Sequence, residues 1–223
     1  MDYTPASQWR TLNWSTPSWI GRTSEIWLHH GAAGSPTLAT LRAYERHHVS
    51  TNGWLALGYS WAVTADGIYE GRGWHRAGAH TRGRNDVSHA VLLVGDWSSA
   101  TVPPQMVDMA AEVIRDGIDR GALTSDVTIG GHREAPGQST ACPGLGGMAA
   151  VRKIAAKARQ PKEPDMDEQT LRRIVREEID RASDSRNLGD DARRVRISLR
   201  ALARASDVPV DVDGPADGSH VIA

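Results

Sequence analysis

A histidine and a cysteine close together in one loop are the residues of this chain whose types and spacing point most directly to chemistry. His132 and Cys142 stand ten residues apart in the run GGHREAPGQSTACPG, and Cys142 is the only cysteine among the 223 residues. A single cysteine cannot form a disulfide within the chain. An imidazole and a thiolate brought together by a Gly/Pro-rich loop are instead well suited to bind Zn²⁺.

A third ligand is offered far upstream in the run EIWLHHG, where the pair His29–His30 ends an apolar stretch. Two imidazoles and one thiolate would fill three corners of a tetrahedron and leave the fourth for water, which is typical of catalytic rather than structural zinc sites. Zn²⁺ lowers the pKa of a bound water to about 7, so a hydroxide-like nucleophile would be available at neutral pH.

The elements that must position these ligands are those of an α/β domain, with a mixed central β-sheet flanked by helices. Apolar runs and a hairpin turn at Asp66–Gly67 predict strands, and apolar residues at three- and four-residue spacing predict helices. The strands are expected at residues 26–30, 59–64, 68–70, 90–94 and 127–129, and the helices at 37–50, 104–120 and 145–159, with Thr37 as an N-cap.

Bulk composition excludes some classes of partner. The formal net charge is -1 at pH 7, so we expect no nucleic-acid partner. There is no apolar run of about 18 residues, so we expect no membrane insertion. The start of the chain, MDYTPASQWRTLNW, lacks the charged and apolar regions of a secretory signal peptide. We therefore expect the protein to be made in a cytoplasm and to stay there until another factor releases it.

Six motifs, in one order along the chain, carry a family resemblance. They are LHHGA at 28–32, LGYSW at 57–61, DGIYEGR at 66–72, GAHTRGRN at 78–85, VLLVGD at 91–96 and GHRE…TACPG at 131–144. Each is weak alone, but together they resemble the zinc-dependent N-acetylmuramoyl-L-alanine amidases of the phage lysozyme and peptidoglycan recognition protein superfamily. The resemblance covers roughly residues 22–158.

The resemblance implies that His29, His132 and Cys142 are the zinc ligands. His29 is the first histidine of its pair, and His30 should point to the opposite face because side chains alternate along a strand. The resemblance also implies that Tyr59 and Thr140 are catalytic and stabilise the oxyanion. Lysine often stands at the position of Thr140, and a hydroxyl should contribute less than that cation.

Further residues of the motifs are expected to contact substrate or to support the site. His80 and Asn85 should line the cleft that holds glycan or peptide, and Trp74 could stack on a sugar, although a core tryptophan is an equal alternative. Glu134 is read as pairing with an arginine to hold its loop rather than as a base. The other histidines are expected at the surface, with His89 either facing solvent or supporting the site; the surface set is His47, His48, His75 and His220.

The composition changes at Gln160, where the polar run QPKEPDMDEQ begins. We expect the catalytic domain to occupy residues 1–160 and a linker to occupy 161–167. A short helical C-terminal appendage is expected at 168–206, because apolar residues form stripes at helical spacing there. It could serve self-association or targeting to the cell wall. The Pro/Gly/Asp-rich residues 207–223 are expected to be disordered.

The function implied by the resemblance is hydrolysis of the amide between N-acetylmuramic acid and L-alanine in peptidoglycan. The expected setting is a phage endolysin, stored in the host cytoplasm and acting on the wall after release. A cytosolic amidase that recycles wall fragments is one alternative, and a module that binds peptidoglycan without cutting it is another. A zinc deaminase is disfavoured because its P-C-x-x-C half needs two cysteines.

Overall fold

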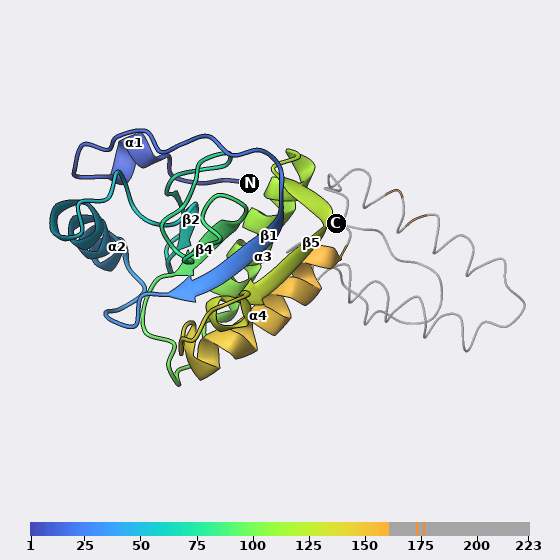
Figure 1. Cartoon of the computed structure of the whole chain (residues 1–223). Coiled ribbons are helices and arrows are strands. Elements are labelled where there is room, and N and C mark those ends of the chain that lie inside the picture. Colours follow the sequence, from blue (N-terminus) through green and yellow to red (C-terminus); the bar gives the residue numbers. More distant parts are fainter. Residues whose placement is uncertain (161–172, 174–175, 177–223) are drawn as a thin grey trace, which may run out of the picture. The chain divides into compact units, whose positions relative to one another are not determined.

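The computed structural model describes residues 1–160 together with residues 173 and 176 (Figure 1). The chain divides into two units after Pro161, and the elements below all belong to the first unit, Met1–Pro161. The expected linker at 161–167 and tail at 207–223 lie outside the described residues. So does the expected appendage at 168–206, apart from residues 173 and 176.

A five-stranded mixed sheet forms the centre of the unit, in the order β3-β2-β4-β1-β5. The strands β2 (Trp61–Val63), β4 (His89–Leu93), β1 (Thr23–His30) and β5 (Leu123–Gly131) run parallel to one another. Only β3 (Ile68–Glu70) is antiparallel, paired with β2 in the hairpin that the sequence predicts. The predicted mixed α/β fold is confirmed.

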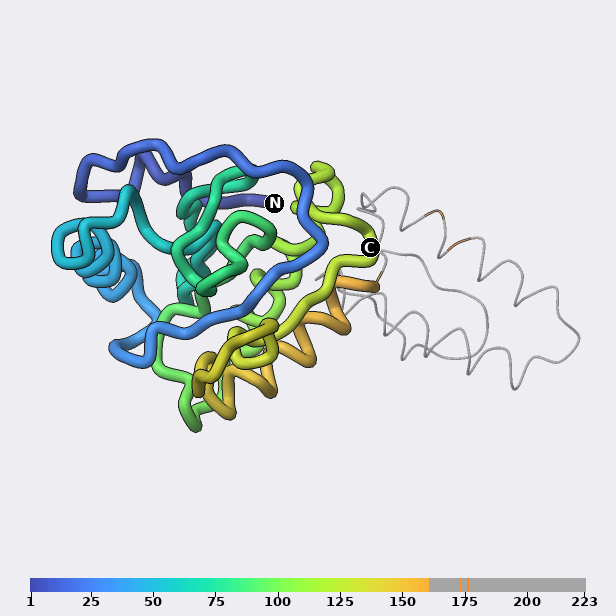
Figure 2. Tube along the Cα trace, in the orientation of Figure 1, coloured from blue at the N-terminus to red at the C-terminus, as the bar shows by residue number. Residues whose placement is uncertain are grey.

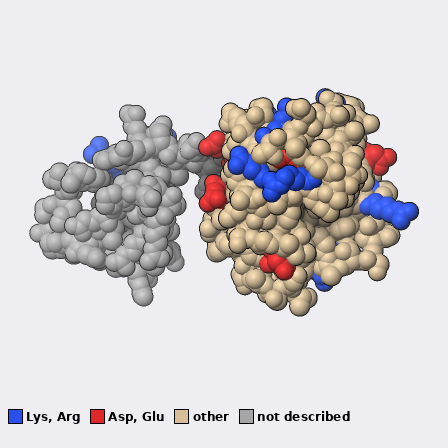
Figure 3. All heavy atoms as spheres, turned by 90° about the vertical axis from the view of Figure 1, so that its left-hand side faces the viewer, with Lys and Arg blue, Asp and Glu red and all other residues tan. Residues whose placement is uncertain are grey.

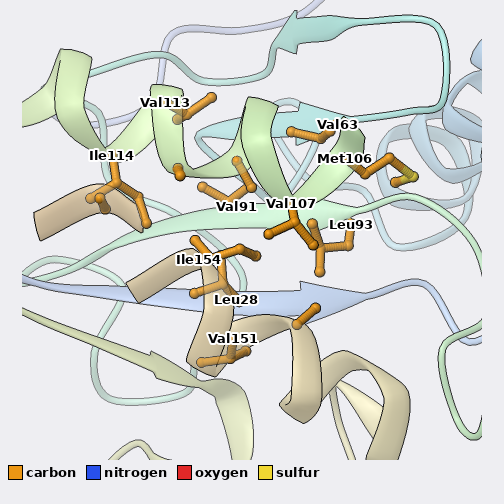
Figure 4. Close-up of a cluster of buried hydrophobic side chains, with 14 of the residues drawn as sticks. Leu28, Val63, Val91, Leu93, Met106, Val107, Val113, Ile114, Val151 and Ile154 are labelled. Atoms are coloured by element: carbon orange, nitrogen blue, oxygen red, sulfur yellow. The ribbon is translucent and has the colours of Figure 1, made fainter. Parts of the chain in front are cut away.

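Two long helices, α3 (Pro104–Asp119) and α4 (Gly144–Arg159), pack against one face of the sheet. Their apolar residues recur at helical spacing and meet alternate residues of the strands, so the two periodicities together build one buried cluster. Figure 4 shows part of this cluster, and the side chains labelled there are Leu28, Val63, Val91, Leu93, Met106, Val107, Val113, Ile114, Val151 and Ile154.

The opposite face of the sheet carries a second, smaller apolar cluster, which includes Leu92 and Leu41. Leu41 comes from α2 (Leu38–Arg46), which begins after the predicted N-cap Thr37; its hydroxyl accepts from the backbone N–H of Thr40. Helix α2 continues into a short π-helical turn, η1 (His47–Thr51), so the helix predicted over 37–50 is present but changes type near its end.

The N-terminal segment, the darkest blue part of the tube in Figure 2, is an addition that the sequence did not predict. It contains the short helix α1 (Ala6–Trp9) and pairs with the hairpin region where Thr4 bridges to Tyr69. Glu45, which is fully buried on α2, holds the segment by accepting hydrogen bonds from it; the donors are the backbone N–H groups of Thr11 and Leu12, the Thr11 hydroxyl and the Trp14 indole.

Charge is sparse on the face of this unit that Figure 3 turns toward the viewer, where a group of Lys and Arg side chains lies on a mainly uncharged surface. Residues 1–160 contain 15 Lys and Arg and 13 Asp and Glu, a formal difference of +2. This face therefore presents no extended field of one sign. Among the described residues, no helix has the length and apolar character needed to cross a membrane.

Candidate metal centre

Three residues from distant parts of the sequence converge at the carboxyl ends of two neighbouring parallel strands. His29 lies near the end of β1, and His132 opens a short 3₁₀ turn, η2 (His132–Glu134), directly after β5. The pairing of Leu28 with Gly131 places the two histidines side by side, with ring centroids 4.4 Å apart. One ligand atom from each of His29, His132 and Cys142 lies within 4.8 Å of the others.

The cysteine reaches this point through a tightly bonded loop between η2 and α4. The carbonyl of Cys142 accepts from the backbone N–H of Arg133 at 3.0 Å, and the Cys142 N–H donates to the Thr140 hydroxyl at 3.2 Å. Gly144 then turns the chain with φ +83°, and a Cβ there would lie 2.3 Å from the Trp97 carbonyl oxygen. Only glycine suits both demands, so the CPG sequence itself delivers the sulfur to the strand ends.

The sulfur of Cys142 is held next to both histidines of the HH pair. It lies 3.7 Å from Nδ1 of His29 and accepts from the backbone N–H of His30 at 3.4 Å. The side chain of His30 turns to the other face of the sheet, where its Nδ1 accepts from the Trp97 N–H at 3.1 Å. Because side chains alternate along β1, His29 faces the cluster while His30 faces the other side and holds the loop at Trp97.

The donor set fits Zn²⁺ in chemistry, and the distance between Cys142 and His29 fits it in spacing. Tetrahedral zinc with one sulfur and one nitrogen ligand separates those two atoms by about 3.5 Å, close to the observed Sγ to Nδ1 distance. Burial, reinforced by His80, His132 and His30, holds the pKa of His29 well below its usual value, which keeps the imidazole neutral as metal binding requires. Burial raises the pKa of the Cys142 thiol to about 11, and a bound cation would reverse that effect.

Tyr59 stands beside the three residues, with its ring centroid 5.2 Å from that of His29. Burial first, then the neighbouring Cys142 and Tyr44, raise the pKa of its phenol above the usual range. The hydroxyl therefore remains protonated at neutral pH and can act only as a neutral donor or acceptor. Thr140 is near the cluster through its bond to Cys142, and because its oxygen accepts in that bond its own proton stays free to be donated.

The three residues expected to contact substrate fall in different places. His80 packs edge-on against His29, with ring centroids 5.4 Å apart, and burial lowers its pKa to about 3, so a neutral imidazole lies beside the cluster. Asn85 uses its side-chain oxygen to accept the backbone N–H groups of His80 and Thr81. Trp74 packs into the core beside α3 and donates to Asp116 at 3.0 Å, which corresponds to the core alternative rather than to a sugar-stacking wall.

Two expectations about the remaining histidines need correction. His89 is fully buried and bonded to Ser60 at 3.0 Å, so it does not face solvent. His48 is half-buried rather than on the surface; it stacks on Trp54 at 4.5 Å, and burial lowers its pKa to about 4.

Glu134 accepts from the backbone N–H of Gly131 and pairs with Arg152 at 3.1 Å. These are the contacts of a residue that holds its loop.

Two polar residues at the cluster were not singled out from the sequence. The hydroxyl of Thr81 lies 3.3 Å from Nε2 of His29, and the side-chain oxygen of Gln138 lies 3.2 Å from Nε2 of His132. Thr81 lies within the GAHTRGRN motif and Gln138 within the loop from His132 to Cys142, but their residue types alone do not mark them as ligands or catalytic groups. Only the folded arrangement distinguishes them.

Comparison with known proteins gives matches over the same part of the chain. Residues 21–145 match the family described as Amidase_2, N-acetylmuramoyl-L-alanine amidase. Peptidoglycan-recognition protein SC1a of Drosophila melanogaster is 35% identical over 123 residues, which are 52% of this chain and 65% of that protein. The human N-acetylmuramoyl-L-alanine amidase is 36% identical over 132 residues, 53% of this chain and 22% of the human protein.

Solved structures agree with the sequence matches. A variant of Drosophila PGRP-LB in complex with tracheal cytotoxin superposes with a TM-score of 0.62 at 30% identity, covering 67% of this chain and 92% of that chain. Tracheal cytotoxin is a monomeric diaminopimelic acid-type peptidoglycan. The chain thus spans nearly all of this structure, but less than two thirds of the length of the SC1a and human proteins.

Proposed function

Because the chain belongs to the N-acetylmuramoyl-L-alanine amidase family, we propose that it hydrolyses the amide between the lactyl group of N-acetylmuramic acid and L-alanine in peptidoglycan. Zn²⁺ would be held by His29, His132 and Cys142. The observation that carries the proposal is the convergence of these three ligand atoms within 4.8 Å, with the Tyr59 ring against them. The complex of the related PGRP-LB variant with a peptidoglycan monomer supports the substrate class.

The chain's own residues would each have a definite task in this reaction. When bound, Zn²⁺ supplies a Lewis acid that polarises the scissile carbonyl and lowers the pKa of water. The Tyr59 hydroxyl, kept protonated by burial, would donate to the carbonyl oxygen as it gains negative charge. The Thr140 hydroxyl, whose proton is not used in its bond to the Cys142 N–H, would offer a second and weaker hydrogen-bond donor next to Cys142. As water adds to the carbon, the amide C–N bond breaks and the proton lost by water passes to the leaving amine.

A non-catalytic peptidoglycan-binding module is the competing function, since several relatives carry the name of recognition proteins. The presence of all three ligand residues and of Tyr59 favours catalysis, because a module that only binds needs neither the thiolate nor the phenol. The deciding experiment is release of L-alanine-terminated peptide from purified peptidoglycan, measured as new α-amino groups. We expect release that a chelator stops and added zinc restores; stoichiometric zinc binding with an intact amide would leave only the binding function.

We further propose that the biological setting is a phage endolysin, which is stored in the host cytoplasm and lyses the wall after release. The segment beyond residue 160 lies outside the family match, and apolar residues recur in its sequence at helical spacing. Such a pattern would suit self-association or attachment to an insoluble wall, since tethering raises the effective concentration of enzyme on substrate. An endolysin should degrade intact walls faster than soluble muropeptides. The opposite preference would favour the cytosolic recycling amidase.

A further inference from the structure

Each of the two histidines of the candidate metal centre has a polar side chain next to its Nε2 atom. In His29, Nδ1 faces the sulfur of Cys142 at 3.7 Å while Nε2 lies 3.3 Å from the hydroxyl of Thr81. The two nitrogens of one ring thus have separate partners. A metal on Nδ1 requires a lone pair there, which places the ring proton on Nε2 and makes it the donor to Thr81.

Gln138 enforces the same tautomer on His132. Its side-chain N–H donates to the backbone carbonyl of Arg82 at 2.9 Å, and a carbonyl can only accept. This contact fixes which end of the amide is nitrogen, so the oxygen is the end that lies 3.2 Å from Nε2 of His132. An amide oxygen also only accepts. His132 must therefore carry its proton on Nε2 and keep Nδ1 as the lone-pair nitrogen.

The groups that contact the two histidines are both connected to one turn, at its adjacent residues Thr81 and Arg82. Thr81 contacts its histidine directly, and Arg82 holds the other through Gln138. Asn85 holds the backbone of this turn, because its side-chain oxygen accepts the backbone N–H groups of His80 and Thr81 at 2.8 and 3.0 Å.

Thr81 is fully buried, and its hydroxyl also lies 2.9 Å from Nδ1 of His80. The Thr81 hydroxyl can donate its single proton to Nδ1 of His80 while its oxygen accepts a hydrogen bond from Nε2 of His29.

We propose that Thr81 and Gln138 are positioning residues which hold His29 and His132 in the Nε2–H tautomer, so that both rings present Nδ1 to the metal. The inference rests on the metal site of the proposed function. Groups that hold metal ligands from outside fix ring orientation and raise ligand basicity, and their loss usually lowers metal affinity about 10- to 100-fold. The turn at Thr81–Arg82 would then set the geometry of a centre to which it contributes no ligand.

The test compares Thr81→Val, which keeps the shape and loses the hydroxyl, with Thr81→Ser, which keeps the hydroxyl. Zinc affinity is measured by competition with a chromophoric chelator, on the full chain. We expect about 10- to 100-fold weaker binding for Thr81→Val and for Gln138→Met, and affinity close to wild type for Thr81→Ser. Equal affinity of Thr81→Val and wild type would overturn the proposal.

A matched control separates positioning from general stability. Thr64 is also fully buried, and its hydroxyl serves only the local turn, accepting from Asp66 N–H at 3.0 Å. Thr64→Val should lower the melting temperature without changing zinc affinity. If it weakens zinc binding as much as Thr81→Val does, the effect of Thr81 is one of stability and the proposal fails.

A measurement without metal keeps this inference distinct from the proposed function. Imidazole ¹H–¹⁵N correlation spectra of the metal-free protein report which nitrogen of each ring bears the proton. We expect both His29 and His132 as Nε2–H tautomers, with His29 losing that preference in Thr81→Val. Predominant Nδ1–H in the wild type would refute the positioning role even if zinc binds, whereas the expected tautomers in a protein that binds no zinc would refute only the proposed metal.

Discussion

Leu28 and His29 are neighbours in β1, are almost equally buried, and belong to two regions with opposite requirements. Leu28 points toward α3 and α4 into a cluster held by non-directional apolar contact. His29 points the other way, where each ring nitrogen has a separate partner at a defined distance. Removing side-chain volume from the first region should lower the free energy of unfolding, and removing ligand or hydrogen-bonding atoms from the second should lower zinc binding or the rate of hydrolysis.

The largest effect is expected from removing the sulfur. Cys142→Ala deletes one of three converging ligand atoms, so bound zinc and amide hydrolysis should both fall below detection. The far-ultraviolet circular dichroism should remain that of the wild type, because the apolar cluster is untouched. Zinc content and amine release are measured together, with Ser139→Ala in the same loop as the control. Wild-type turnover by Cys142→Ala would remove Cys142 from the site.

The apolar cluster should show the reverse pattern. Ile114→Ala empties part of a fully buried site beneath α3 and should lower the free energy of unfolding by about 2–5 kcal/mol. Urea unfolding of the metal-free protein measures this, and Ile118→Ala, on the same helix but only partly buried, should cost less. Zinc affinity should not change. A large loss of affinity in Ile114→Ala would show that the two regions are coupled.

His89 is a buried polar side chain on the apolar side of the sheet, so it should respond to pH where its apolar neighbours do not. Burial, with a smaller contribution from His75, lowers its pKa to about 4. His89 takes up a proton near pH 6.5 in the unfolded chain but only near pH 4 in the folded chain. The folded state is therefore favoured fully above pH 6.5, and the free energy of unfolding falls as the pH drops from 6.5 toward 4. The loss corresponds to about 3 kcal/mol. His89→Gln should flatten the unfolding free energy between pH 7 and pH 4 relative to wild type; identical slopes would contradict this.

Tyr59 should give the smallest effect, confined to rate. Tyr59→Phe keeps the ring against His29 and removes the hydroxyl, so zinc should still bind while kcat/KM falls about 10²-fold or more. Tyr69→Phe, a buried strand tyrosine in the second apolar cluster, is the matched control. Undiminished turnover in Tyr59→Phe would assign Tyr59 to packing alone.

The pattern of apolar residues predicted the strands and helices of the first unit well where both faces of an element are buried. The strand expected at 127–129 was too short, since β5 extends over Leu123–Gly131. β5 is an edge strand, and the exposed Ser125 and Asp126 interrupt its apolar run. The apolar pattern marks only the buried residues of a strand, so a half-exposed strand is predicted to be shorter than it is.

Within the motifs, rare residue types could be singled out from the sequence, whereas residues whose role depends on contact with a distant segment could not. His29 and Cys142 stand out by type in their motifs, and the fold brings them together. Thr81 lies 52 residues from His29 and is an ordinary loop threonine in the sequence. The assignment of His48 to the surface was wrong for a related reason, because Trp54 covers it only after the chain turns at η1.

X-ray absorption at the zinc edge of the purified full chain would show directly whether His29, His132 and Cys142 bind the metal together. We expect one zinc per chain with one sulfur at about 2.3 Å and nitrogen or oxygen ligands at about 2.0–2.1 Å, and loss of the sulfur shell in Cys142→Ala. A wild-type protein that retains no zinc after dialysis in zinc-containing buffer, or zinc bound without sulfur, would contradict it.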